Sequence, residues 1–259
     1  MIYLVEKWKL ALKEFLKKYE EDDDVVGAIL CGSYANDTYN DSSDINVYLV
    51  LKNSVKEIEE GHTESNSYLI SYFKRNSNSI KKLMNIDYEA TNSLVVANMF
   101  AYGKIIYDLD GSVKELQDLA LDYIDRPLRN IDATLFDINN RFLATSMIEL
   151  KEALKEQRPD FNIIYYELLK HIYIDYCEYE GIPTYQESKI YKILTDEEYR
   201  KKSHIFKVPD NKFIKLYLNC YEIEKPNVMY NNIKKLLDYY YERIGGFNIR
   251  QFKIRTELD

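Results

Sequence analysis

The chain has 259 residues, of which 46% are hydrophobic and 30% charged, and its formal net charge is -8. A chain of this length and composition folds into one or two globular domains with a real core, which excludes a largely disordered protein. The negative charge disfavours nucleic acid as a partner, because nucleic-acid binding relies on Lys and Arg. It is compatible with a cationic small-molecule substrate.

The cysteines and the apolar segments indicate the compartment. Cys31, Cys177 and Cys220 lie far apart and show no zinc-ligand spacing, so we expect free thiols in a reducing cytosol. The N-terminal stretch carries Glu6, Lys7 and Lys9 within its apolar pattern, unlike a signal peptide. No segment approaches about 18 apolar residues, so no membrane span is predicted. We therefore expect a cytoplasmic protein, and a homodimer stays open as its assembly.

Secondary structure in the first half alternates between helix and strand. Residues 4–20 carry apolar side chains at helical spacing, and "VVGAILC" (25–31) is the first predicted strand. "DINVYLVL" (44–51) is the second strand and "NSYLISYF" (66–73) the third, with "GHTESN" (61–66) as a turn before it. Two helices are expected over residues 76–101, then a strand in "GKIIYDLDG" (103–111) and a helix over 112–123.

The character of the chain changes near Pro127, after which no strand is predicted. Helical periodicity covers residues 131–157, 161–180, 186–202, 210–223 and 227–244, and the tail from residue 245 is expected to be extended. We therefore predict an α+β protein with two domains, residues 1–126 carrying a mixed sheet with helices and residues 127–259 being all helical.

Residues 31–50, "CGSYANDTYNDSSDINVYLV", carry the strongest chemical signal. Gly32 has no Cβ, so backbone N–H groups near it can approach a phosphate closely, and Ser33 adds a hydroxyl donor. Asp44 stands at the entry of the second strand, and position 46 shares its face because side chains alternate along a strand. Oxygen ligands at 44 and 46 are suited to Mg²⁺ shared with substrate phosphates.

Gly-Ser, ten intervening residues and then "DIN" resemble the signature of the nucleotidyltransferase superfamily, the polymerase-β-like fold. The α/β half followed by a helical half is similar to bacterial aminoglycoside and lincosamide nucleotidyltransferases. The resemblance implies a nucleotidyltransferase domain over 1–126 and a helical substrate-binding domain over 127–259. It implies that Gly32, Ser33 and Asp44 bind a nucleoside triphosphate and that Asp44 and Asn46 hold Mg²⁺ or Mn²⁺.

Two features depart from this signature. Asn46 stands where a second acid is expected, and an amide oxygen brings no negative charge. A third acid is normally carried by a later strand, but the predicted strand has Ser71 near that place, with Glu64 at its start as a substitute. Loss of a metal ligand lowers the rate by about 10² to 10⁴. We therefore expect Asn46 to lower catalysis, while the strand itself tolerates either residue.

The helical half is expected to supply the proton acceptor. In the antibiotic-modifying relatives a Glu of this half acts as the base, which points to Glu149, with Glu152 beside it. A solvated helix face is the simpler interpretation of both residues, since exposed Glu on helices is ordinary. His171 is a further proton acceptor by chemistry, although a structural role is the simpler interpretation. His62 and His204 lie in polar, loop-like contexts without a motif.

The sequence thus predicts an enzyme that moves a nucleoside monophosphate from a nucleoside triphosphate to a hydroxyl of an aminoglycoside-like small molecule. Asp44, Asn46 and Glu149 are its predicted catalytic residues. One alternative is a nucleotide-binding regulatory protein that has lost the chemistry, and another is transfer to a protein or an RNA. A native Asn46 and one introduced to trap an inactive complex both fit the sequence.

Overall fold

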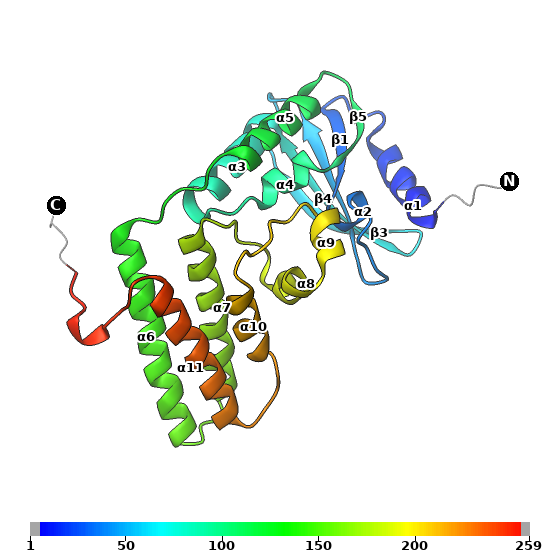
Figure 1. Cartoon of the computed structure of the whole chain (residues 1–259). Helices are drawn as coiled ribbons and strands as arrows, with labels where there is room; N and C mark the ends of the chain where they lie inside the picture. The colour runs from blue at the N-terminus through cyan, green and yellow to red at the C-terminus, as the bar shows by residue number, and fades with distance from the viewer. Residues whose placement is uncertain (1–5, 255–259) are drawn as a thin grey trace. The chain divides into compact units, whose positions relative to one another are not determined.

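The protein forms two compact units, seen in a computed structural model that describes residues 6–254 (Figure 1). The first unit, here called the sheet unit, comprises the chain up to Pro127 together with Asp196–Ile205. The second, the helical unit, comprises Leu128–Thr195 and the chain from Phe206 onward. In the sheet unit, the His204 ring stacks on the Tyr102 ring with centroids 3.7 Å apart, so this contact holds the segment 196–205 to the first part of the chain.

The sheet unit contains one five-stranded mixed sheet with helices on both faces. The mixed sheet with helices is as predicted, but one of its five strands was not predicted. The strand order is β3-β4-β2-β1-β5, in which β2 and β4 run parallel and the other neighbours antiparallel. The elements in chain order are α1 (Lys7–Leu16), η1 (Lys17–Tyr19), β1 (Val25–Cys31), α2 (Gly32–Ala35), β2 (Ile45–Leu51), β3 (Glu59–Ser65), β4 (Tyr68–Asn76), α3 (Ser77–Thr91), α4 (Val95–Ala101), β5 (Lys104–Asp108), α5 (Ser112–Asp125) and α9 (Glu197–Lys202).

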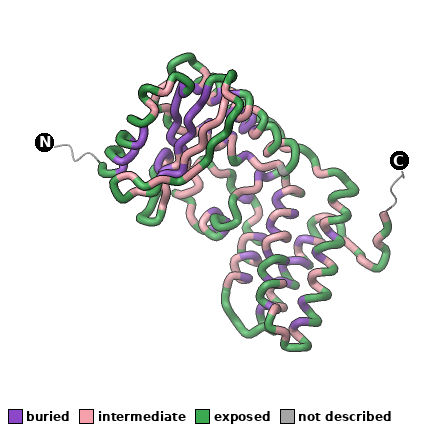
Figure 2. The backbone as a smooth tube through the Cα atoms, turned by 180° about the vertical axis from the view of Figure 1, so that it is seen from behind, coloured by how far each residue is buried: buried purple, intermediate pink, exposed green. Residues whose placement is uncertain are grey.

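The two central strands are apolar because both of their faces are covered. All seven residues of β1 are buried, and six of the seven in β2 (Figure 2). One face packs on α1, where Trp8, Leu12 and Phe15 form a core with alternate residues of β2. On the other face, Tyr48 contacts the rings of Phe73 and Phe100 at 4.8 and 4.9 Å. The sheet positions are therefore fixed by burial on both sides.

The helical unit contains the remaining helices, and no strand longer than a single bridge is found in its described part. They are α6 (Ala133–Lys155), α7 (Phe161–Glu180), η2 (Glu187–Lys189), α8 (Ile190–Thr195), α10 (Asn211–Asn219), α11 (Pro226–Arg243) and η3 (Ile249–Gln251). Their core is rich in tyrosine, with Tyr165, Tyr173 and Tyr176 of α7 fully buried. Within residues 6–254, no helix is long and apolar enough to cross a bilayer.

Three predictions of secondary structure were wrong. The predicted turn "GHTESN" contains residues 61–65 of the edge strand β3, and only Asn66 lies in the turn. This strand has no buried residue and so lacks the apolar pattern of a strand. The predicted helix 186–202 is divided, because Asp196 accepts a hydrogen bond from the Tyr199 N–H and starts α9 as a new helix. The tail from residue 245 is interrupted by η3.

Candidate functional site

Asp44 and Asn46 lie together at the entry of β2. Both residues are half-buried, and both side chains are on the sheet face that carries Tyr48. The Asn46 amide nitrogen donates to Asp44 Oδ1 at 3.3 Å and to the Asp44 carbonyl oxygen at 3.4 Å. The amide therefore orients the carboxylate, and its own oxygen stays available as a neutral ligand.

Ser71 occupies the place on the neighbouring strand where a third acid was sought. The parallel register of β2 and β4 pairs Asn46 with Ser71, so both side chains lie on one face. The Ser71 hydroxyl, which is buried, donates to Asp44 Oδ2 at 2.5 Å. Asp44 thus accepts one hydrogen bond on each carboxylate oxygen from two neutral side chains. This explains why a polar serine is stable at 3% exposure.

Gly32 forms the turn that follows β1, on the other side of β2 from Ser71. Its φ is +67°, in the left-handed region that favours glycine. A Cβ placed on it would lie 3.5 Å from the Asn46 amide nitrogen, so Gly32 faces the Asp44–Asn46 pair directly. Ser33 follows in the one-turn helix α2 and is half-buried. Gly32, Ser33, Asp44, Asn46 and Ser71 are called the Asp44 site below.

The loop between the turn and β2 is held in place by rings and by its own polar side chains. Tyr34 stacks on Tyr39 at 4.3 Å and also contacts Trp8 of α1. The Asn40 side-chain oxygen accepts hydrogen bonds from the backbone and hydroxyl of Ser42. The loop of residues 36–43, which follows α2 and precedes Asp44, is therefore held in one conformation by these contacts.

The oxygen donors of this site fit a single hard cation brought by a nucleotide. Mg²⁺ is usually held by one or two carboxylates together with substrate phosphates and waters, and Asp44 with the Asn46 amide oxygen can meet that need. Over residues 6–254, no group of three or more His, Cys, Asp or Glu side chains is close enough to hold a metal.

The residues expected to act from the helical half all belong to the helical unit. Glu149 is exposed on α6 and pairs with Arg158 at 3.6 Å. Glu152 is exposed on the same helix. His171 packs edge-on against Phe142 at 4.6 Å, and burial lowers its pKa. A structural role therefore accounts for His171.

Two further titratable residues did not stand out in the sequence. His62, placed in a loop by its polar neighbours, is on β3 opposite Ser71. Asp175 on α7 is only 5% exposed, and it accepts a hydrogen bond at 3.3 Å from Asn139, whose amide also reaches Glu178. Burial, reinforced by the Glu178 charge, raises the pKa of Asp175 to about 7.

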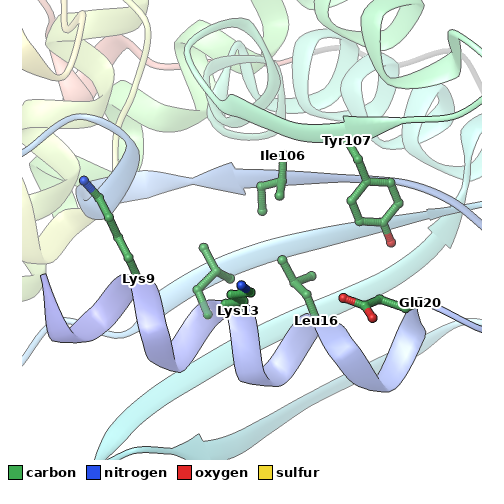
Figure 3. A pocket seen from close by; sticks show the side chains of 7 residues that line it. Lys9, Lys13, Leu16, Glu20, Ile106 and Tyr107 are labelled. Carbon is green, nitrogen blue, oxygen red and sulfur yellow. The ribbon is translucent and has the colours of Figure 1, made fainter. Parts of the chain in front are cut away.

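A pocket of about 280 Å³ lies between α1 and β5 (Figure 3). Lys9, Lys13 and Leu16 line it from the helix, and Ile106 and Tyr107 line it from the strand. Tyr107 packs against the core under α1, on the sheet face opposite Tyr48. This pocket is therefore separate from the Asp44 site.

Comparison with known proteins adds three findings. The family model described as nucleotidyltransferase domain matches residues 11–119. A protein of the archaeon Methanocaldococcus jannaschii named "putative protein adenylyltransferase" is 30% identical over 105 residues, which cover 38% of this chain and 71% of that protein. A crystal structure of a nucleotidyltransferase-like protein from Exiguobacterium sibiricum aligns with 90% of this chain and 75% of its own, at 12% identity and a TM-score of 0.44.

Proposed function

The chain belongs to the nucleotidyltransferase family, and we propose that it transfers a nucleoside monophosphate from a nucleoside triphosphate to an acceptor hydroxyl at the Asp44 site. The observation that carries the proposal is the placement of Asp44 between the Gly32 turn and Ser71. The residues of the family motif therefore lie together at one half-buried site.

Each residue of the site has a chemical task in this proposal. The Gly32 turn and the Ser33 hydroxyl receive the triphosphate, because a backbone without Cβ leaves room for phosphate oxygens. Asp44 and the Asn46 amide oxygen would hold the Mg²⁺ that accompanies the nucleotide, and this ion would neutralise charge on the phosphates. Asn46 and Ser71 fix the orientation of Asp44 by their hydrogen bonds.

The acceptor is proposed at the level of a class. The resemblance to antibiotic-modifying enzymes supports a hydroxyl of an aminoglycoside-like molecule, with Glu149 as its proton acceptor. The name of the archaeal relative supports a second candidate, a protein hydroxyl with ATP as the donor. A third candidate, a regulatory nucleotide-binding protein, is favoured by the neutral residues Asn46 and Ser71 in place of acids.

The proposal is tested by transfer from nucleotides labelled in the α-phosphate. Each of the four ribonucleoside triphosphates is incubated with Mg²⁺ or Mn²⁺ and with kanamycin, casein or the chain alone as acceptor. We expect labelled product that is lost in Asp44→Asn and kept in Asp41→Asn, an exposed loop carboxylate that serves as the matched control. Nucleotide binding without labelled product would favour the regulatory candidate, and absence of both would refute the proposal.

A further inference from the structure

His62 lies in the same cross-strand row as the Asp44 site. The register of β3 and β4 pairs His62 with Ser71, and Ser71 is in turn paired with Asn46. The alternate residues Thr63 and Ile70 are paired on the opposite face, where Ile70 belongs to the core under α1. His62 is therefore on the same face as Asp44, with its Cβ about 5 Å from that of Ser71.

The His62 imidazole is open to solvent and is not engaged by the neighbouring polar residues of the described chain. His62 is exposed, and within residues 6–254 neither a hydrogen bond nor an ion pair engages its ring. On its own strand and face, Glu60 pairs with Arg75, and Glu64 is exposed. The helix that packs against β3 is α1, which reaches the strand from the opposite face through the Ser65–Ala11 hydrogen bond. The ring therefore has no structural task in the described part of the chain.

If the proposed function holds, the strand order indicates from which side of the phosphorus the acceptor attacks. Across the sheet, the Gly32 turn follows β1, Asp44 enters β2, Ser71 is on β4 and His62 is on the edge strand β3. Phosphoryl transfer places the attacking and leaving oxygens roughly in line, on opposite sides of the phosphorus. If the pyrophosphate leaves on the Gly32 side, the acceptor attacks from the Ser71–His62 side.

We propose that His62 is the proton acceptor for the acceptor hydroxyl. The hydroxyl proton moves to an imidazole nitrogen, and the freed oxygen forms a bond to the α-phosphorus. The bond from that phosphorus to the bridging oxygen breaks, and pyrophosphate leaves with the electron pair. Neighbouring strands are about 4.8 Å apart, so His62 stands about 10 Å from Asn46, which leaves room for an acceptor oxygen above Ser71.

The position of β3 at the sheet edge suits this role. No strand is paired on its outer side in the described chain, so a bulky acceptor can reach the His62 face without displacing the sheet. Glu64, two residues further along on the same face, offers a carboxylate to a cationic acceptor. This arrangement accommodates either acceptor class of the proposed function.

The test compares His62→Gln with two matched variants. Thr63→Ala is on the same strand but on the opposite face, and Glu149→Gln removes the competing base of the helical unit. In His62→Gln we expect kcat to fall about 100-fold or more while the nucleotide KM stays within about threefold. Thr63→Ala should behave as the parent.

A second measurement separates chemistry from structure. Added free imidazole should restore part of the rate in His62→Ala, since the position is exposed, and should leave Thr63→Ala unchanged. A His62→Gln rate close to the parent rate, or a large loss confined to Glu149→Gln, would overturn the assignment of His62 while leaving the proposed function intact. A parent chain that transfers no nucleotide to any acceptor, in the original and the Asn46→Asp forms alike, overturns both.

Discussion

Replacing Asn46 with aspartate should make the stability of the sheet unit depend on a divalent cation. The Asn46 amide now donates to Asp44 Oδ1 at 3.3 Å. Asn46→Asp removes that hydrogen bond and sets two carboxylates at a similar separation. Two like charges about 4 Å apart repel by about 4 kcal/mol at the effective dielectric constant of a protein surface. Because both residues are half-buried, solvent screens part of this repulsion. We therefore expect Asn46→Asp to lower the free energy of unfolding by about 2 kcal/mol in the absence of metal.

The cation should reverse this loss. Mg²⁺ between the two carboxylates replaces repulsion with attraction, and a ligand that binds only the native state stabilises it. In thermal unfolding at constant ionic strength, Asn46→Asp should melt about 5 °C below the original chain in EDTA and recover most of that difference in saturating Mg²⁺. The original chain should respond to Mg²⁺ much less. Its nucleotide affinity should differ from that of Asn46→Asp by less than about tenfold, whereas the transfer rate should rise by a larger factor.

The matched control is Asn66→Asp, which adds the same charge in the exposed β3–β4 turn of the same unit. It should show no recovery with Mg²⁺. If Asn46→Asp melts like the original chain in EDTA, or if both aspartate variants respond equally to Mg²⁺, then positions 44 and 46 do not share a metal, and the assignment of the Asp44 site is wrong.

Two further outcomes are expected. Gly32→Val should abolish Mg-nucleotide binding in a thermal-shift titration, because a branched side chain would occupy the space that the phosphates need. Gly111→Val is the control, since Gly111 also has a positive φ but open space around it, so this variant shows the effect of backbone strain alone. Because the pKa of the buried Asp175 is raised to about 7, ionisation of this carboxyl lowers the stability of the folded helical unit as pH rises from 4 to about 7. Asp175→Asn removes that loss, so its stabilising effect should grow over this range and reach up to about 4 kcal/mol above pH 7. A gain that is constant between pH 4.5 and pH 8 would contradict the assigned pKa.

The parts of the site that the sequence predicted are those fixed by local pattern. The apolar runs of β1 and β2 are buried on both faces, so their limits and the turn at Gly32 can be read from composition. Asp44 follows from its spacing to Gly32 and from the alternation of strand side chains. The helices after Pro127 follow from their periodicity in the same way.

The parts that the sequence missed depend on pairing between segments. β3 is polar because it is an edge strand, so the apolar pattern that reveals a strand is absent. The place of His62 is set by the register of β3 against β4, which no local pattern encodes. Asp175 belongs to a helix with apolar residues on several sides, and only the packing of α6, α7 and α11 shows that its carboxyl is buried. For such residues, tertiary contacts decide the chemistry.

The neutral residues around Asp44 bear on how a cation would reach the site. In a site with two or three carboxylates, mutual repulsion draws a cation in before any substrate arrives. Here the Asn46 amide and the Ser71 hydroxyl each supply a hydrogen to the one carboxylate, so it is satisfied in the absence of metal. A cation that arrives alone must compete with those two hydrogen bonds for the Asp44 oxygens, and it gains attraction from only one negative charge. A cation already bound to a triphosphate brings its own phosphate ligands and needs only one carboxylate oxygen. On the proposed function, we therefore expect the cation and the nucleotide to bind together rather than the cation first.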